Sequence, residues 1–268
     1  MEKLISVAVM RASDAAEIAG GTDSKTLMYR AGLGLFQSWD WHGKIDIVTG
    51  SGNNAGDGYV LALLLRQHGI PCRIVRTSEK VSPDGGYFFA KCEERGIPVT
   101  DSVDFSQTDI LVDCLLGTGF RGELRPSMRH IVEQINQSGA AVLSVDINSG
   151  MNGDSGDGFC VRSDRTVSIG CLKYAHLLGM AQGKIGSLYN YDIGIPCKGS
   201  YLPLFTGDDR TPESWDFVPA KSFPQILDNF HIPAGEPAQR LQMMADALRE
   251  KMQFFTVSDA DALPYAEL

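Results

Sequence analysis

Short apolar runs alternate with longer segments of helical spacing along most of the chain. The apolar runs have the length and composition of buried strands, and they cover residues 45–49, 72–76, 109–113, 140–147, 166–169 and 187–193. Apolar residues recur at helical spacing over residues 11–19, 26–39, 58–68, 83–95 and 126–137. Strands that alternate with helices are typical of a mainly parallel sheet covered on both faces. The pattern predicts an α/β fold over residues 1–200, a Rossmann-like three-layer αβα sandwich.

The pattern changes after residue 200, so we treat residues 201–268 as a C-terminal extension. Residues 206–237 hold many prolines and acidic residues and no strand pattern. Residues 238–255 predict one amphipathic helix. Its apolar face carries Leu241, Met244, Leu248 and Met252. Such a helical arm would pack on the domain itself or on a partner subunit, as in a homodimer. The alternative is a remnant of, or a linker to, a second catalytic domain.

A glycine-rich segment, residues 50–58, joins the first predicted strand to a helix. Its sequence is Gly-Ser-Gly-Asn-Asn-Ala-Gly-Asp-Gly. Glycines let the backbone turn sharply and let a ligand approach closely, and the start of a helix favours a phosphate group. Many tight strand-to-helix turns bind nothing. However, Asn53, Asn54 and Asp57 add polar groups that such a turn does not need. The segment therefore predicts a ligand site.

This segment differs from the two common nucleotide-binding loops. It lacks the Lys-Ser/Thr pair of a P-loop. Its glycine spacing is one residue longer than that of the dinucleotide fingerprint. The second strand ends in Arg76, where a dehydrogenase has an acidic residue for the ribose. A standard NAD dehydrogenase is therefore disfavoured.

Composition narrows the classes of function and the compartment. The 268 residues carry a net charge of −9, which disfavours sequence-independent binding to nucleic acid or to an anionic membrane. The six cysteines are scattered, with no Cys-x-x-Cys motif, so neither zinc nor a disulfide framework is supported. No early apolar run is long enough for a signal sequence or a membrane span. We expect a cytoplasmic protein.

Two further strand ends carry unusual polar sequences. The first loop, residues 112–123, holds Asp113 and three glycines; the second, residues 145–151, holds Asp146 and Ser149. Ligands bind at the carboxyl ends of the strands of an open parallel sheet, so these loops should converge with the glycine-rich segment. Each aspartate has a structural alternative, as a helix cap or a solvated acid. Oxygen ligands without histidine or cysteine suit a hard cation rather than zinc.

These three loops, and other segments in the same order, resemble the NAD(P)H-hydrate epimerase family, also called the YjeF N-terminal domain. The resemblance covers about residues 8–197. It also rests on Leu-Met-Tyr-Arg-Ala-Gly at 27–32, on Asp-Arg-Thr-Val-Ser-Ile-Gly at 164–170 with Lys173 just after, and on Tyr-Asp-Ile-Gly-Ile-Pro at 191–196. It implies a substrate hydrated at carbon six of the reduced nicotinamide ring. The family equilibrates the R and S forms of hydrated NADH or NADPH, so that a separate dehydratase can remove the water.

The resemblance also implies a set of site residues. The substrate would contact Asn53, Asn54, Ala55, Gly56, Asp57, Gly117, Thr118, Gly119, Phe120, Arg121, Gly122, Glu123 and Asp146. A potassium ion would be held by Asn54, Asp113 and Ser149. The chain departs from the family pattern at Ala55, in place of the commoner glycine, and at Asn148, in place of the commoner proline. The change at Asn148 implies a less fixed backbone before Ser149.

Inversion at ring carbon six requires a proton to be delivered and recovered, and we expect Asp146 to be the principal catalytic acid/base. Asp57 is expected to stay ionised because it opens a helix, and Lys173 is a candidate second proton carrier. One rival is a non-catalytic nucleotide- or partner-binding protein on the same fold. A bifunctional epimerase and dehydratase is a second rival. It is disfavoured because only 68 residues follow residue 200.

Overall fold

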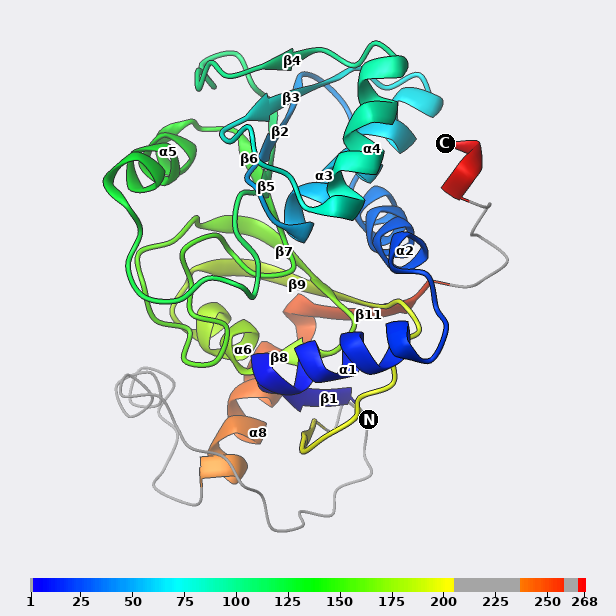
Figure 1. Cartoon of the computed structure of the whole chain (residues 1–268). Helices are drawn as coiled ribbons and strands as arrows, with labels where there is room; N and C mark the ends of the chain where they lie inside the picture. The colour runs from blue at the N-terminus through cyan, green and yellow to red at the C-terminus, as the bar shows by residue number, and fades with distance from the viewer. Residues whose placement is uncertain (1, 205–236, 258–264) are drawn as a thin grey trace.

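The computed structural model describes residues 2–204, 237–257 and 265–268, and its centre is a parallel sheet with helices on both faces (Figure 1). In spatial order the strands are β11 (Met252–Thr256), β9 (Ile185–Asp192), β7 (Ser163–Ile169), β6 (Ala141–Val145), β5 (Ile110–Cys114), β2 (Ile45–Thr49), β3 (Cys72–Arg76) and β4 (Val99–Thr100). Each neighbouring pair is parallel. The predicted α/β fold with a mainly parallel sheet is confirmed.

The helices bury both faces of this sheet. One face is covered by α2 (Ser24–Gln37), α3 (Asn53–Gln67) and α4 (Pro83–Glu94), and the other by α5 (Pro126–Gln137) and α6 (Tyr174–Ala181). Successive residues of one strand serve the two faces, since Val112 belongs to the cluster with α3 and Leu111 to the cluster with α5. Burial on both faces is the reason why these strands are continuous apolar runs rather than alternating ones.

The strand order reverses between β2 and β5. The chain runs from β2 outward to β3 and β4, then returns to β5 on the other side of β2 and continues through β6 to β7. At such a switch point the loops after the two central strands diverge and leave a crevice at the carboxyl edge. The turn after β2 and the loop after β5, both singled out from the sequence, flank this crevice.

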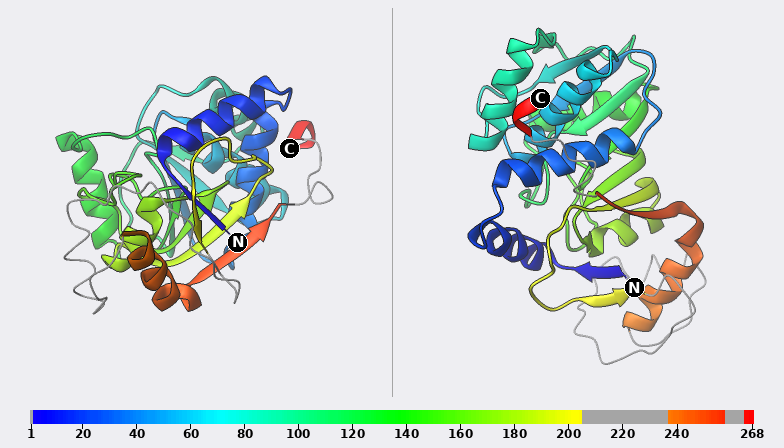
Figure 2. Two further views of the ribbon diagram at one scale, coloured as in Figure 1. Left: turned by 90° about the horizontal axis from the view of Figure 1, so that it is seen from below. Right: turned by 90° about the vertical axis from the view of Figure 1, so that its right-hand side faces the viewer.

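A second, smaller sheet lies beside the main one and was not predicted. It contains β1 (Glu2–Ile5), β8 (Leu172–Lys173) and β10 (Leu202–Leu204), with β1 in the middle. Figure 2 shows β1 beside the yellow strand β10, close to the N-terminus. Helix α1 (Val7–Ala19) follows β1 directly. It begins four residues before the predicted segment, because Ser6 caps it by accepting a hydrogen bond from the amide of Val9.

Helix α3 also begins earlier than predicted. We expected residues 50–58 to be a loop with the helix starting at Gly58, but the helix starts at Asn53. Gly52, in an extended conformation, occupies the N-cap position. The polar residues of the segment are therefore the first turns of the helix, and Asp57 lies a full turn inside it.

The single helix expected over residues 238–255 is wrong in its second half. The chain forms α8 (Pro237–Leu248), a short 3₁₀ turn and then strand β11, which pairs in parallel with β9 at the sheet edge. Met252 continues the helical spacing but lies on the strand. Leu241, Met244 and Leu248 are buried against α6, so within the described residues this segment packs on its own domain. Residues 205–236, with most of the proline-rich stretch, lie outside the described residues, and the domain boundary at residue 200 stays a prediction.

Candidate functional site

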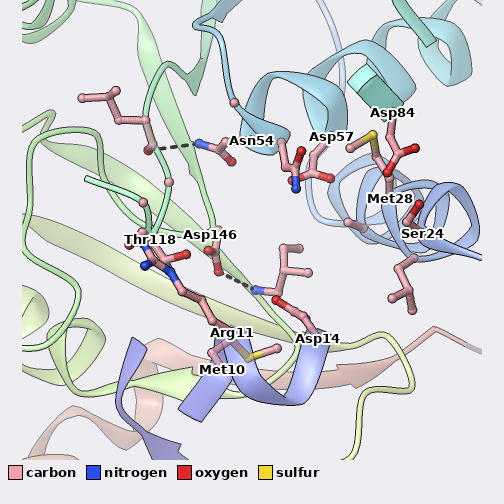
Figure 3. Close-up of a pocket in the computed structure, with 18 of the residues that line it drawn as sticks. Met10, Arg11, Asp14, Ser24, Met28, Asn54, Asp57, Asp84, Thr118 and Asp146 are labelled. Atoms are coloured by element: carbon pink, nitrogen blue, oxygen red, sulfur yellow. Dashed lines mark hydrogen bonds between the residues drawn. The ribbon is translucent and has the colours of Figure 1, made fainter. Parts of the chain in front are cut away.

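A cavity of about 530 Å³ lies at the switch point (Figure 3). Its walls come from α1, the start of α2, the turn into α3, the loop after β5 and the residues that follow β6 and β7. Eight of the predicted substrate residues line it: Asn53, Asn54, Asp57, Gly117, Thr118, Gly119, Phe120 and Asp146. The loops after β2, β5 and β6 thus meet at one edge of the sheet, as expected for the carboxyl ends of parallel strands.

Five other predicted substrate residues lie outside the cavity lining. Ala55 is fully buried, and a side chain at Gly56 would collide with Met28, so both belong to the packing of α3 on its neighbours. Arg121 points to Asp154, with its guanidinium nitrogen 3.7 Å from the carboxylate. Gly122 and Glu123 line a separate cavity of about 230 Å³. The loop after β5 therefore reaches the main cavity only with its first half.

The glycine-rich turn packs tightly against the loop after β5. The amide of Gly50 donates to the carbonyl of Cys114 at 3.2 Å. A Cβ atom at Gly50 would collide with the carbonyl oxygen of Leu115. Because only glycine permits this approach, the two loops flanking the crevice form one rigid rim.

Asp113 lies behind this rim and organises it. Its carboxylate accepts hydrogen bonds from the hydroxyl of Ser149 at 2.5 Å, the amide of Ser149 at 2.9 Å and the hydroxyl of Ser144 at 3.0 Å. The amide of Leu115 is a further donor, at 3.3 Å. Burial raises the pKa of Asp113, and these hydrogen bonds act against the shift. Asp113 and Ser149 therefore join the ends of β5 and β6 rather than lining the cavity.

Asn54 connects this cluster to the cavity. Its side-chain amide donates to the carbonyl of Leu116 at 3.1 Å, and the hydroxyl of Ser149 lies 3.1 Å from the same carbonyl. The amide oxygen of Asn54 is buried and has no hydrogen-bond partner. A buried amide oxygen without a hydrogen-bond partner suits a hard cation. Within the described residues, no group of three or more His, Cys, Asp or Glu side chains is arranged to hold a metal ion.

Asp146 occupies a rare backbone conformation directly after β6. Its φ of 61° is the one positive φ among non-glycine residues of the described chain. The amide of Ile147 donates to the carbonyl of Val145 at 2.7 Å, so Asp146 is the centre of a tight γ-turn. Such a conformation persists only where its surroundings hold it in place, and it is common at functional sites. The turn directs the Asp146 carboxylate into the cavity (Figure 3).

Two buried residues that follow β7 hold Asp146 in this conformation. The Nζ atom of Lys173 lies 2.6 Å from Oδ1 of Asp146 and donates to the carbonyl of Ile169 at 2.7 Å. His176 contacts the backbone carbonyl of Asp146 through Nε2, at 2.6 Å. Because Nδ1 of His176 accepts from the amide of Lys173, Nε2 carries the proton and donates. Burial, and secondarily the charge of Lys173, lowers the pKa of His176 to about 4, so the ring is neutral.

Two more carboxyl groups face the cavity and carry raised pKa values. Burial raises the pKa of Asp57 well above its ordinary value, and the charges of Asp146 and Asp14 add to the shift. Asp57 does not open the helix as expected: it lies beyond the first turn of α3, where the helix dipole has little effect. Burial also raises the pKa of Asp14 to about 6, with Lys173 acting against the shift and Asp146 adding to it.

Asn148 does not loosen the turn before Ser149, contrary to our expectation. Its side-chain amide donates to the carbonyls of Val161 and Lys184 and to the hydroxyl of Ser163. Its oxygen accepts from the hydroxyl of Thr166 at 2.6 Å. A fully hydrogen-bonded buried amide ties the turn to β7 and to the residue before β9, and so replaces the constraint that a proline would supply.

Sequence reasoning missed the contribution of α1 and α6 to the site. Arg11 and Asp14 of α1 line the cavity, and His176 of α6 supports it. Helix α1 was expected, but nothing in its pattern indicated a cavity wall. Helix α6 spans eight residues and is buried almost all round, so it has no polar face that would reveal it.

The fold and the site define a class: a doubly wound α/β protein with a small-molecule cavity at its topological switch point. A family model described as "YjeF-related protein N-terminus" matches residues 24–175, more than half of the chain. The chain belongs to this family.

Curated relatives share the same region. The chain is 34% identical over 185 residues to an NAD(P)H-hydrate epimerase of Lentilactobacillus buchneri, covering 65% of this chain and 86% of that protein. It is 31% identical over 188 residues to a bifunctional NAD(P)H-hydrate repair enzyme Nnr of Coxiella burnetii, covering 66% of this chain and only 38% of that protein. The similarity thus spans most of the first relative and little more than a third of the second.

A solved structure supports the fold. The crystal structure of yeast ynu0, YNL200c, matches with a TM-score of 0.57 at 22% identity, covering 65% of this chain and 83% of that chain. At that identity the match bears on the architecture alone. Among the described residues, no helix is long and apolar enough to cross a membrane.

Proposed function

We propose that this protein is an epimerase that interconverts the R and S forms of hydrated NADH or NADPH. The observation that carries the proposal is the Lys173–Asp146 pair, held at 2.6 Å by a strained turn on the wall of the cavity. A structural ion pair would not need a γ-turn that directs its carboxylate into a cavity. The curated name of the Lentilactobacillus buchneri relative, which the chain matches over most of its length, supports the same activity.

The shape of the cavity fits a nucleotide. Its volume of about 530 Å³ is in the range of small-molecule sites. The first turn of α3, with Asn53 and Asn54, offers a helix N-terminus to the phosphate groups. Asp146 and Lys173 lie on another wall of the same cavity. We place the hydrated ring beside Asp146, with the phosphates at the start of α3.

The reaction needs proton transfer and no change of redox state. Inversion at ring carbon six breaks and remakes either the carbon–oxygen bond or the bond from that carbon to the ring nitrogen. In either route a proton is delivered to one atom and recovered from another. We assign Asp146 as the principal acid/base, with the Lys173 amine holding its carboxylate in place through the 2.6 Å contact.

We also propose that potassium binds at Asn54, Asp113 and Ser149. The unpartnered amide oxygen of Asn54, the Asp113 carboxylate and the hydroxyl of Ser149 would supply the oxygen ligands that hard cations prefer. A bound cation would supply positive charge that fixes the two loops of the rim. The reacting atoms would be handled by the chain's own side chains.

The direct test mixes the R hydrate with a purified S-specific dehydratase and measures the recovery of NADH with and without this protein. Conversion of the R form at micromolar protein supports the epimerase. An unconverted R form, with nucleotide still bound to the protein, would indicate a non-catalytic nucleotide-binding protein. The separate dehydratase as pathway partner is part of the same proposal. The expected homodimer stays a prediction, which sedimentation analysis can check.

A further inference from the structure

Helix α1 forms a fixed wall of the cavity, although no sequence motif marks it. The amide of Val7 donates to the carboxylate of Asp154 at 2.7 Å, which anchors the start of the helix. The guanidinium of Arg11 donates to the carbonyl of Thr118 at 2.9 Å, which anchors the next turn to the loop after β5. Asp14 follows one turn later and points into the cavity (Figure 3). These contacts of α1 therefore fix the position of Asp14 in the cavity wall.

The carboxyl groups of the cavity divide into paired and unpaired ones. Asp146 pairs with Lys173, and Asp84 lies 3.4 Å from the amine of Lys25. Within the described part of the chain, the side chains of Asp14 and Asp57 have no hydrogen-bond or ion-pair partner. Asp57 belongs to α3, on the side of the predicted phosphate site. Asp14 comes from α1, on a wall to which no role is yet assigned.

Inversion at one ring carbon calls for proton transfer on both faces of the ring. The hydroxyl that leaves one face must be protonated, and the water that arrives at the other face must lose a proton. A single side chain reaches one face of a bound ring. A second titratable group on a different wall from Asp146 would complete the chemistry.

We propose that Asp14 is this second catalytic acid/base, which acts from the α1 wall while Asp146 acts from the strand ends. The inference rests on the proposed epimerase function. Asp14 gives a proton to the hydroxyl oxygen at carbon six; the carbon–oxygen bond breaks, its electron pair leaves with water, and the lone pair of the ring nitrogen forms a carbon–nitrogen double bond. A second water adds to the other face, the double-bond pair returns to nitrogen, and Asp146 takes the proton of that water. The reverse direction exchanges the two roles.

The electrostatic surroundings support this role. The charges of Lys173 and Asp146 act on Asp14 from across the cavity. Asp57 of α3 and Arg11 of α1 line the same cavity, and the charge of Asp14 in turn acts on Asp57. Burial is the largest cause that raises the pKa of Asp14 to about 6. A carboxyl with a pKa near neutrality exchanges its proton in both directions, which suits a reversible acid/base.

The test compares Asp14→Asn with the wild-type chain in the coupled assay with the R hydrate. We expect kcat to fall by about 100- to 10,000-fold with KM changed by no more than a few-fold. In the wild type, kcat/KM should fall about tenfold per pH unit above pH ~6, as Asp14 loses its proton, and this limb should disappear in Asp14→Asn. Glu17→Gln is the matched control, since Glu17 lies on the same helix, accepts from the hydroxyl of Thr22 and does not line the cavity. It should keep the wild-type rate and pH profile.

A stability measurement separates catalysis from folding. The folded-state pKa of Asp14 is raised above its ordinary 3.8, so its ionisation weakens the fold as pH rises through about 6. Asp14→Asn should therefore melt at or above the wild-type temperature at pH 7.5. If Asp14→Asn melts at a lower temperature, the pH profile of Asp14→Glu is measured instead. A shift in the pH at which kcat/KM falls supports Asp14 as the second acid/base, and an unchanged pH overturns that assignment. An Asp14→Asn variant with an unchanged kcat and pH profile also overturns the role of Asp14, and leaves the proposed epimerase function standing. A wild type that converts no R hydrate defeats the proposed function, and the inference with it.

Discussion

The amine of Lys173 lies 2.6 Å from the carboxylate of Asp146, and the Lys173 side chain is only 1% exposed. The same short segment holds Asp146 a second time, because His176 donates to its backbone carbonyl. Side chain and backbone of Asp146 are thus fixed by residues from one turn, about thirty positions later in the chain. This double attachment explains how a non-glycine residue keeps a φ of 61°.

The first prediction concerns the carboxylate of Asp146. Asp146→Asn keeps the shape of the side chain and removes the titrating group, so epimerisation should slow by about 100- to 10,000-fold. Nucleotide binding, measured by calorimetry, should change little. Turnover near that of the wild type would transfer the acid/base role to Lys173 or to solvent.

The second prediction concerns the buried partner of Asp146. Lys173→Met leaves a largely buried carboxylate without its counter-charge, and the free energy of unfolding should fall by about 3–5 kcal/mol. The double variant with Asp146→Asn should recover part of this loss, because the uncompensated charge is gone. Denaturant unfolding of the single and double variants measures the coupling between the two residues. Additive losses would show that the pair is not coupled.

The third prediction concerns potassium. Exchanging potassium for lithium at constant ionic strength should lower the melting temperature and the turnover, since a cation that binds only the folded state stabilises it. In Asn54→Ala, which removes the unpartnered amide oxygen, the difference between the two ions should vanish. An unchanged melting temperature in the wild type in both salts would remove this site.

The fourth prediction concerns pH and His176. Its folded-state pKa of about 4 lies below the ordinary 6.5, so the unfolded chain binds the proton more tightly and stability falls as pH drops from about 6.5 to 4. The effect of this one group amounts to up to about 3 kcal/mol. His176→Gln should flatten this acid dependence, whereas His42→Gln should not, because His42 is exposed. Equal pH slopes in the two variants would contradict the assignment.

The fifth prediction concerns the C-terminal helix α8. Met244 is fully buried against α6, so Met244→Ala should lower the free energy of unfolding by about 2–5 kcal/mol. The neighbouring Met243 is 44% exposed, and Met243→Ala should change stability by less than about 0.5 kcal/mol. Equal effects of the two substitutions in chemical denaturation would show that α8 does not pack as described. Turnover per folded molecule should stay at the wild-type level in both.

The sequence alone determined the layered fold and most of the cavity rim. Apolar runs alternating with helices specify parallel strands, and parallel strands necessarily bring their carboxyl ends to one edge. For that reason Asn54, Asp113 and Asp146, far apart in the chain, could be placed on one rim from their positions after strands. The expected substrate and reaction came from the resemblance to a family, since the positions of polar residues after strands do not identify a substrate.

Other features were decided only by tertiary packing. Met252 continues the helical spacing of α8, and its place in a strand depends on the open edge of β9, which no local pattern encodes. Whether Asp57 is charged depends on its burial and on Asp14 and Asp146, which belong to other elements. The partners of Asp146 are likewise Lys173, at the end of the short strand β8, and His176, on a helix with no amphipathic pattern. Local spacing specifies the elements, whereas burial and charge arise from contacts between residues distant in sequence, and these contacts decide the chemistry of the site.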